Sequence, residues 1–243
     1  MKKFIALLLA IVMVLSLAAC GGEKDPVSDN GGNNSNDTPV NNEQTQPEET
    51  KGGNDEPVVS GGISLNKLMN APVSPESDFE CMDQGNGGLV LLQYLGSSEV
   101  VVIPETWNGM PITAISSYVF ANDSSVKAIR LADNIEVVMG GAFGLNKNLE
   151  IVVCGNSLKK IDEAAFQSCS NLHTVVLNDG LETICGVSFS GCKSLVELEI
   201  PASVTEIQPM TFYNGPENLT IIGETGSAAE AYANSEGIAF QAK

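Results

Sequence analysis

Phenylalanine recurs at one fixed interval through the second half of this 243-residue chain. Each is followed 23 residues later by the next, at Phe120, Phe143, Phe166, Phe189 and Phe212. Several aliphatic columns keep the same step, one of them being Ile115, Val138, Ile161, Ile184 and Ile207. A unit of this length cannot close a core alone, so stacked units must bury their equivalent side chains against one another. The sequence therefore predicts a solenoid of five 23-residue repeats.

Each repeat also contains a short segment in which apolar and outward positions alternate. In the segment Leu172–Leu177, alternation directs Val175 and Leu177 into the core, and Thr174 and Val176 outward. Equivalent strands of successive repeats are expected to pair in parallel, about 4.8 Å apart. A turn and a second short extended piece follow, so the fold class is mostly β.

The repeat resembles the BspA-type leucine-rich repeat of bacterial surface proteins. The best match is Leu195–Pro201, followed by Val204, Ile207 and Phe212. The resemblance covers about residues 79–243 and implies a leucine-rich-repeat domain on a bacterial surface. The family motif has a cysteine three residues after the phenylalanine.

This cysteine column departs from the family pattern. Cysteine stands there only at Cys169 and Cys192, and the other repeats have Asp123, Asn146 and Gly215. We expect looser turns at the three substituted positions.

The two ends of the repeat domain are expected to be capped. Residues 79–104 resemble the hairpin that opens such domains, with Gly85, Gly87 and Gly88 as turn formers. Residues 223–243 resemble the family's closing helix, which Ser227 can cap and Gly237 can end.

The amino terminus has the pattern of a lipoprotein signal peptide, residues 1–19. Two lysines precede an apolar run that is too short to span a bilayer. The run ends in Leu17, Ala18, Ala19 and Cys20, which resemble a lipobox. This predicts cleavage before Cys20 and a lipid on that cysteine, which would anchor the protein on the extracellular side of the cell membrane. An ordinary signal peptide with a chance cysteine is the alternative.

Two segments connect the anchor to the repeats. Residues 20–62 are acidic and lack aromatic residues, so we expect a disordered tether with a reach of about 35 Å. Residues 63–78 form a lead-in segment, in which Ile63, Leu65, Leu68 and Met69 allow either a short helix or an extended strand.

The charge and residue usage argue against several function classes. The net charge of −18 offers no basic face for nucleic acid. Neither a phosphate-binding glycine loop nor a clustered metal site is visible, since the only histidine is His173 and the cysteines are scattered. We therefore predict a protein that is not an enzyme and needs no cofactor, metal or small-molecule substrate.

The cysteines leave two questions open. Cys169 and Cys192 are 23 residues apart, so they could form a disulfide or stand as stacked, buried thiols, and we favour the thiols. A pair of Cys185 and His173 is the basis for the remote alternative of a thiol-dependent hydrolase. The repeat register places these two residues on different faces.

The outward strand positions are the candidate partner-binding face. The candidates alternate with core positions and include apolar residues where solvent is expected: Val102, Arg130, Ile151, Val153, Thr174, Val176, Glu197 and Glu199. Two alternatives remain, because β-branched residues favour strands in general and because residues 63–78 could cover this face.

The sequence as a whole predicts a membrane-anchored extracytoplasmic module that binds or adheres to a protein or surface polymer. The alternative is a non-catalytic scaffold or accessory protein of the cell envelope.

Overall fold

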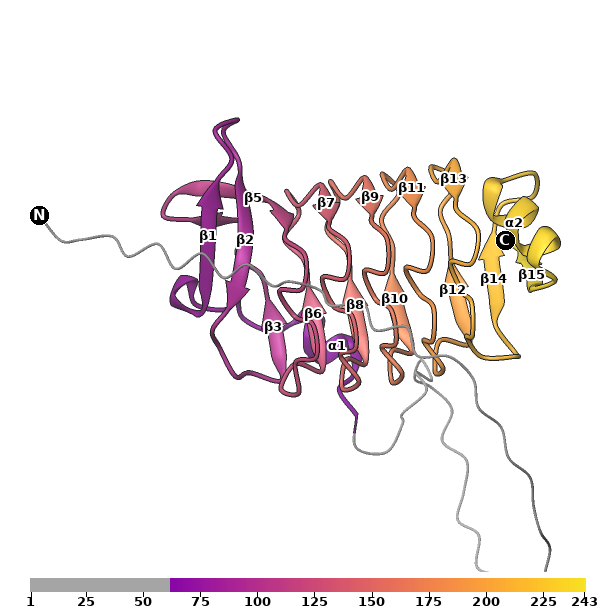
Figure 1. Cartoon of the computed structure of the whole chain (residues 1–243), viewed down its shortest axis with the longest axis horizontal. Coiled ribbons are helices and arrows are strands. Elements are labelled where there is room, and N and C mark those ends of the chain that lie inside the picture. The colour runs from indigo at the N-terminus through magenta and orange to yellow at the C-terminus, as the bar shows by residue number, and fades with distance from the viewer. Residues whose placement is uncertain (1–61) are drawn as a thin grey trace, which may run out of the picture. The chain divides into compact units, whose positions relative to one another are not determined.

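Two rows of short parallel strands run side by side along the repeats, and each repeat adds one strand to each row (Figure 1). The computed structural model describes residues 62–243. The predictions of a signal peptide, of a lipidated Cys20 and of a tether concern residues 1–61, which lie outside the described residues. None of the helices in residues 62–243 is long and apolar enough to cross a membrane.

The first row forms one sheet, in the order β1-β2-β5-β7-β9-β11-β13. Its strands are β1 (Phe79–Asp83), β2 (Leu89–Tyr94), β5 (Met110–Ile115), β7 (Val137–Val138), β9 (Lys160–Ile161), β11 (Thr183–Ile184) and β13 (Glu206–Ile207). β4 (Thr106–Trp107) pairs with β5 at the side of this row.

The second row is divided between two sheets. The first contains β3 (Val100–Val102), β6 (Ala128–Arg130), β8 (Ile151–Val153) and β10 (Thr174–Val176). The second contains β12 (Glu197–Glu199), β14 (Thr220–Gly223) and β15 (Ala239–Ala242). The outward side of β3, β6, β8, β10 and β12 is called the open face below.

The predicted register is confirmed. Ile129 pairs with Val152, and Val152 pairs with Val175, which are steps of 23 residues. The repeated phenylalanines form one continuous stack, with ring centroids 5.0, 4.9, 5.2 and 5.6 Å apart along the chain. Phe79 and Tyr94 extend this stack at one end and Tyr232 at the other. The solenoid is therefore held together by an aromatic column as well as by its strands.

Both predicted caps are present. β1 and β2 form an antiparallel hairpin, and Gly85 and Gly87 adopt positive φ in its turn. Helix α2 (Ala228–Glu236) begins at Ser227, whose hydroxyl accepts a hydrogen bond from the amide of Glu230, and ends at Gly237 with a φ of 67°. Strand β15, which follows α2 and pairs with β14, was not predicted.

The expectation of looser turns is wrong at Asp123 and Asn146. The Asp123 carboxylate accepts hydrogen bonds from the amides of Ser125 and Val126. Asn146 is buried, and its carbonyl oxygen accepts hydrogen bonds from the amides of Asn148 and Leu149. Each side chain therefore closes its own turn. Gly215 has no side chain to do so.

The residues that flank each phenylalanine have an unexpected backbone conformation. The residues two before and two after it adopt positive φ in every repeat: Tyr118, Asn122, Gly141, Leu145, Ala164, Ser168, Val187, Gly191, Met210 and Asn214. Most are not glycine, and a positive φ at a residue other than glycine lowers the stability of the fold by about 1–3 kcal/mol. Hydrogen bonds between repeats, such as the one from the amide of Phe166 to the carbonyl of Ser188, hold this conformation.

Candidate functional site

The lead-in segment divides the open face into a covered half, formed by β3, β6 and β8, and an exposed half, formed by β10 and β12. Helix α1 (Leu65–Met69) packs against β3 and β6, and a 3-10 turn, η1 (Glu76–Asp78), leads into β1 (Figure 1). Ile63 and Leu68 form a second apolar cluster with outward side chains of the open face: Val102, Ala128, Ile151 and Val153. All six are at most 8% exposed. The lead-in segment is therefore part of the folded domain.

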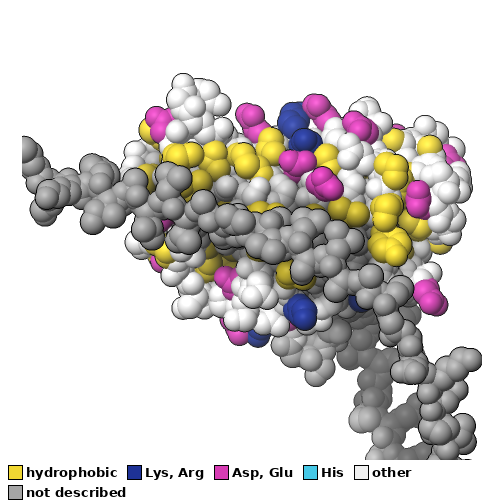
Figure 2. Space-filling view, viewed as in Figure 1, with side chains coloured by type: hydrophobic (Ala, Val, Ile, Leu, Met, Phe, Trp, Pro, Cys, Tyr) yellow, Lys and Arg dark blue, Asp and Glu magenta, His cyan; other side chains and the backbone are white. Residues whose placement is uncertain are grey.

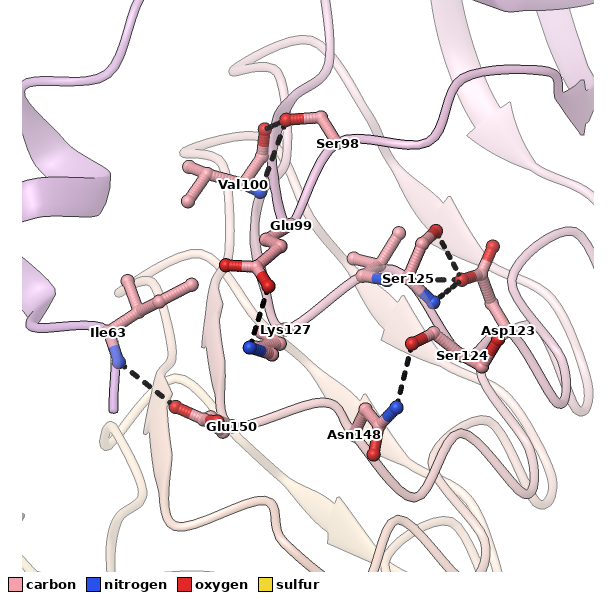
Figure 3. Close-up of polar contacts among 11 residues, drawn as sticks. Ile63, Ser98, Glu99, Val100, Asp123, Ser124, Ser125, Lys127, Asn148 and Glu150 are labelled. Atoms are coloured by element: carbon pink, nitrogen blue, oxygen red, sulfur yellow. Dashed lines mark hydrogen bonds and ion pairs between the residues drawn. The ribbon is translucent and has the colours of Figure 1, made fainter. Parts of the chain in front are cut away.

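Hydrogen bonds fix both ends of the lead-in segment. The amide of Ile63 donates to a carboxylate oxygen of Glu150 over 3.0 Å, as Figure 3 shows. At the other end, the Ser74 amide donates to the Val102 carbonyl over 2.9 Å, and the Val102 amide donates to the Ser74 hydroxyl over 3.1 Å. Between these points, the Ser64 hydroxyl caps α1. The segment thus begins beside the start of β8 and then runs to the free edge of β3, which it closes.

Charged and polar side chains join successive repeats where the strands of the open face begin (Figure 3). Lys127 pairs with Glu99 over 2.7 Å, and the Asn148 side chain donates to the carbonyl of Ser124. The hydrogen bond to Glu99 raises the pKa of Lys127, and Glu150 adds to the effect. The carboxylate of Glu150 thus lies where it can bind the start of the lead-in segment and attract Lys127.

Three of the predicted partner-binding residues are not accessible. Val102, Ile151 and Val153 point outward from the solenoid as expected, but they are only 3%, 1% and 8% exposed. The prediction that they face solvent was wrong because residues 63–78 cover them. The alternative that the sequence left open, a face covered by the lead-in segment, is confirmed for this half.

The other predicted residues lie in the exposed half or at its border. Val176 is 39% exposed, Glu197 and Glu199 are exposed, and Thr174 and Arg130 are half-buried. Glu199 pairs with Lys243 over 2.6 Å, and this contact raises the pKa of Lys243. The exposed half therefore has an apolar residue beside two carboxylates.

The exposed half contains the one interruption of the second strand row within the described residues. β10 and β12 come from neighbouring repeats but belong to different sheets. Phe189 and Phe212, in the same two repeats, have the widest spacing among the stacked phenylalanines, 5.6 Å. Leu177, at the end of β10, is half-exposed, whereas its counterpart Leu131 is 2% exposed. The packing between repeats is therefore looser here.

A groove of about 740 Å³ lies between the lead-in segment and the ends of β3, β6, β8 and β10. Met69, Val73 and Glu76 line it on one side. Arg130 and Val176 also line it, and the turns after the strands form its other border. This groove could not be predicted from the sequence, because it depends on where the lead-in segment packs.

The residues of the hydrolase alternative do not form a site. His173 precedes β10, and its Nδ1 lies 2.9 Å from the hydroxyl of Thr174. Cys185 follows β11, in the other strand row, and burial raises the pKa of its thiol. A protonated thiol is a poor nucleophile. Among residues 62–243, no group of three or more His, Cys, Asp or Glu side chains could hold a metal ion.

The stacked cysteines are buried free thiols, as we favoured. Cys169 donates to the carbonyl of Phe143 over 3.1 Å, and Cys192 donates to that of Phe166 over 3.2 Å. Asn146 makes the equivalent bond to Phe120. Burial raises the pKa of Cys192 to about 12 and raises that of Cys169 as well. Cys154 is also buried in the core, as expected.

The chain has more acidic than basic residues. Figure 2 shows more Asp and Glu than Lys and Arg side chains on the side turned to the viewer. This agrees with the net charge of −18 of the whole sequence.

Comparison with known proteins identifies the repeat. Residues 97–223 match the family described as "BspA type Leucine rich repeat region", in six copies. No curated protein sequence matches the chain.

One solved structure supports this fold, and others with lower structural similarity are also leucine-rich or surface proteins by their names. A leucine-rich repeat protein of T. pallidum is 25% identical, with a TM-score of 0.59 over 62% of this chain and 71% of that one. A leucine-rich cell surface protein of Faecalibacterium prausnitzii is 19% identical, with a TM-score of 0.42 over 64% and 55% of the two chains. The pneumococcal vaccine antigen PcpA is 15% identical, with a TM-score of 0.46 over 61% and 48%.

Proposed function

Because this chain belongs to the BspA-type leucine-rich repeat family, we propose that it is a membrane-anchored binding module of the bacterial cell surface. Its partner would be a protein or a surface polymer, held by the exposed half of the open face. Cys20 would carry the lipid anchor, and residues 21–61 would hold the repeats away from the membrane.

The observation that carries this proposal is the uneven coverage of the open face. The lead-in segment buries the apolar side chains of β3, β6 and β8, but it leaves Val176 39% exposed. Glu197 and Glu199 lie beside it on the next strand of the row. An apolar centre can supply affinity and neighbouring charges can supply orientation, as in other protein interfaces.

The looser contact between β10 and β12 supports the same location. Every other neighbouring pair of strands from β3 to β14 in the second row is hydrogen-bonded in parallel. At the β10–β12 junction this pairing is absent, so we expect the exposed half to adapt its shape to a partner more readily than the covered half.

Two variants test the proposal: one changes the exposed Val176, and a control changes the exposed Met82. The chain from Gly21 onward would be measured by surface plasmon resonance against immobilised matrix proteins and cell-envelope polymers. Val176→Glu should weaken binding at least tenfold, whereas Met82→Glu should not, because Met82 is 53% exposed on the distant β1 hairpin. Equal binding by both variants and the unchanged chain would contradict the role of this face.

A further inference from the structure

We propose that a notch in the turns around the stacked phenylalanines binds the lysine side chain of a partner protein. The notch lies on the segments that join the first strand row to the second, so it does not use the open face. The inference therefore goes beyond the proposed function and can fail independently of it. It depends on three features: a floor without side chains, an exposed aromatic ring and an acidic wall.

The floor of the notch is formed by one repeat that has glycine at three turn positions. In the repeat of Phe143 these are Gly140, Gly141 and Gly144. The neighbouring repeats carry side chains at the equivalent positions, which include Tyr118 and Ala121 on one side and Glu163 and Gln167 on the other. The difference leaves a groove of about 490 Å³, which is lined by the three glycines and by these four residues.

The width of the notch suits a single unbranched chain. The ring centroids of Phe120 and Phe143 are 5.0 Å apart, and those of Phe143 and Phe166 are 4.9 Å apart, so the repeats that form the two walls are about 10 Å apart. Carbon atoms in contact are about 3.5–4.0 Å apart. One alkyl chain can therefore touch both walls, whereas two chains side by side would need about 12 Å.

Tyr118 provides the aromatic ring. A Cβ atom at Gly141 would lie 2.6 Å from Cε1 of Tyr118, so the ring lies against the floor of the notch, where glycine leaves room for it. The side chain nevertheless remains 70% exposed, and most of its surface is open to a ligand. The face of such a ring carries partial negative charge and attracts a cation. Leu145, which is 53% exposed, adds apolar surface to the same notch.

The two charged side chains that line the notch are both acidic. The Asp162 carboxylate accepts a hydrogen bond from the Glu163 amide over 2.9 Å and pairs with Lys160 over 3.3 Å, so its charge is partly offset. Glu163 is exposed and makes no ion pair among residues 62–243. Neither lysine nor arginine lines the notch within this described part of the chain. The notch therefore attracts a cation and disfavours a phosphate or a carboxylate.

A lysine side chain matches these features together. Its unbranched stem can lie across the glycine floor and contact Tyr118 and Leu145, and its ammonium group can then reach the Glu163 carboxylate. The net charge of −18 would also draw a basic partner toward the chain. A neutral sugar could stack on Tyr118 as well, but it would not use the charge of Glu163.

Titrations followed by ¹⁵N NMR of the chain from Gly21 onward test the proposal. The probe is Nα-acetyl-lysine N-methylamide, and the matched comparison is Nα-acetyl-norleucine N-methylamide, which has the same carbon chain without the ammonium group. The lysine probe should shift the amides of Gly141 and Gly144 saturably at millimolar concentration. The norleucine probe and methyl glucoside should each bind at least fivefold more weakly.

Two variants with matched controls locate the contacts. Glu163→Gln and Tyr118→Asn should each weaken binding of the lysine probe at least fivefold. Asparagine suits position 118 because it tolerates the positive φ of 65° found there. Glu217→Gln and Tyr213→Asn are the controls, since both residues are exposed in another turn outside the notch, and they should leave binding unchanged.

Gly144→Gln tests the notch itself. A Cβ atom at position 144 would lie 3.3 Å from the carbonyl oxygen of Gly141, and Gln167 occupies the same position in the next repeat, so the fold can accept the new side chain. The side chain would fill the notch and should abolish binding of the lysine probe. Thermal melting of each variant would establish that the fold is intact.

Four results would overturn the inference: no shift at Gly141 and Gly144, equal binding of the lysine and norleucine probes, tighter binding of methyl glucoside at the same amides, or unchanged binding by Gly144→Gln. None of them bears on the open face, because the proposed function is judged by the effect of Val176→Glu on a large partner.

Discussion

Phe166→Ala removes the central ring of the aromatic column. Phe166 is fully buried, and its ring stacks between those of Phe143 and Phe189 at centroid distances of 4.9 and 5.2 Å. The planes deviate from parallel by only 9° and 8°. No solvent reaches the site, so the space left by the ring must either stay empty or collapse.

The cost can be worked from this environment. Transfer of the ring from water to the core is worth about 2 kcal/mol. An uncollapsed cavity of roughly 100 Å³ adds about 2 kcal/mol at about 24 cal/mol per Å³. We therefore expect a loss of about 3–5 kcal/mol, with the lower value for partial collapse. This is a large part of the roughly 5–15 kcal/mol of a typical domain.

Urea unfolding followed by far-UV circular dichroism and by the fluorescence of Trp107 measures this loss. Phe212→Ala should cost less, because Phe212 is 7% exposed and has its neighbours at 5.6 and 5.9 Å. Tyr213→Ala serves as the control, since this aromatic side chain is 61% exposed and its loss should change stability by under about 0.5 kcal/mol. If Phe166→Ala lowered the free energy of unfolding by no more than the control does, the stacked register would be refuted.

Three further predictions concern other parts of the chain. Cys20→Ser should move the protein out of the membrane fraction, or leave it as an uncleaved precursor, in a fractionation blot; continued membrane binding with cleavage at the same place would refute the lipobox. Val153→Glu should lower the melting temperature strongly, because it buries a charge under the lead-in segment, and a melting curve that matches the unchanged chain would mean that the face is not covered. Unfolding free energy should fall above pH 9, because the Cys192 thiol ionises near 9.0 when unfolded but near 12 when folded. Cys192→Ser should reduce that slope by about 1.4 kcal/mol per pH unit, and an unchanged slope in urea titrations would exclude this source.

The repeat could be predicted from the sequence because each repeat makes the same contacts. Phe143 and Phe166 are equivalent residues, and Ile129, Val152 and Val175 are equivalent strand positions, so one spacing fixes both the stack and the strand register. The caps could be predicted for a local reason, since Ser227 and Gly237 act on the helix that they flank.

The candidate site was harder to predict because it depends on contacts between distant residues. Outward alternation correctly gave the direction of Ile151 and Val153, but burial depends on Ile63 and Leu68, which lie more than 80 residues earlier. The groove at Arg130 results from the same packing. The missing pairing between β10 and β12 could not be predicted either, because the residues of both strands follow the repeat pattern.

The central claim is that only one half of the open face is available to a partner, and thiol labelling tests it most directly. Val153→Cys and Val176→Cys would each be made in a chain that carries Cys20→Ser and Cys81→Ser, which leaves only buried native cysteines. Labelling by a maleimide, with the modified residue identified by mass spectrometry, gives a rate for each position. We expect the thiol at position 176 to react at least tenfold faster than the one at 153. Equal rates at the two positions in the folded protein would contradict the division of this face.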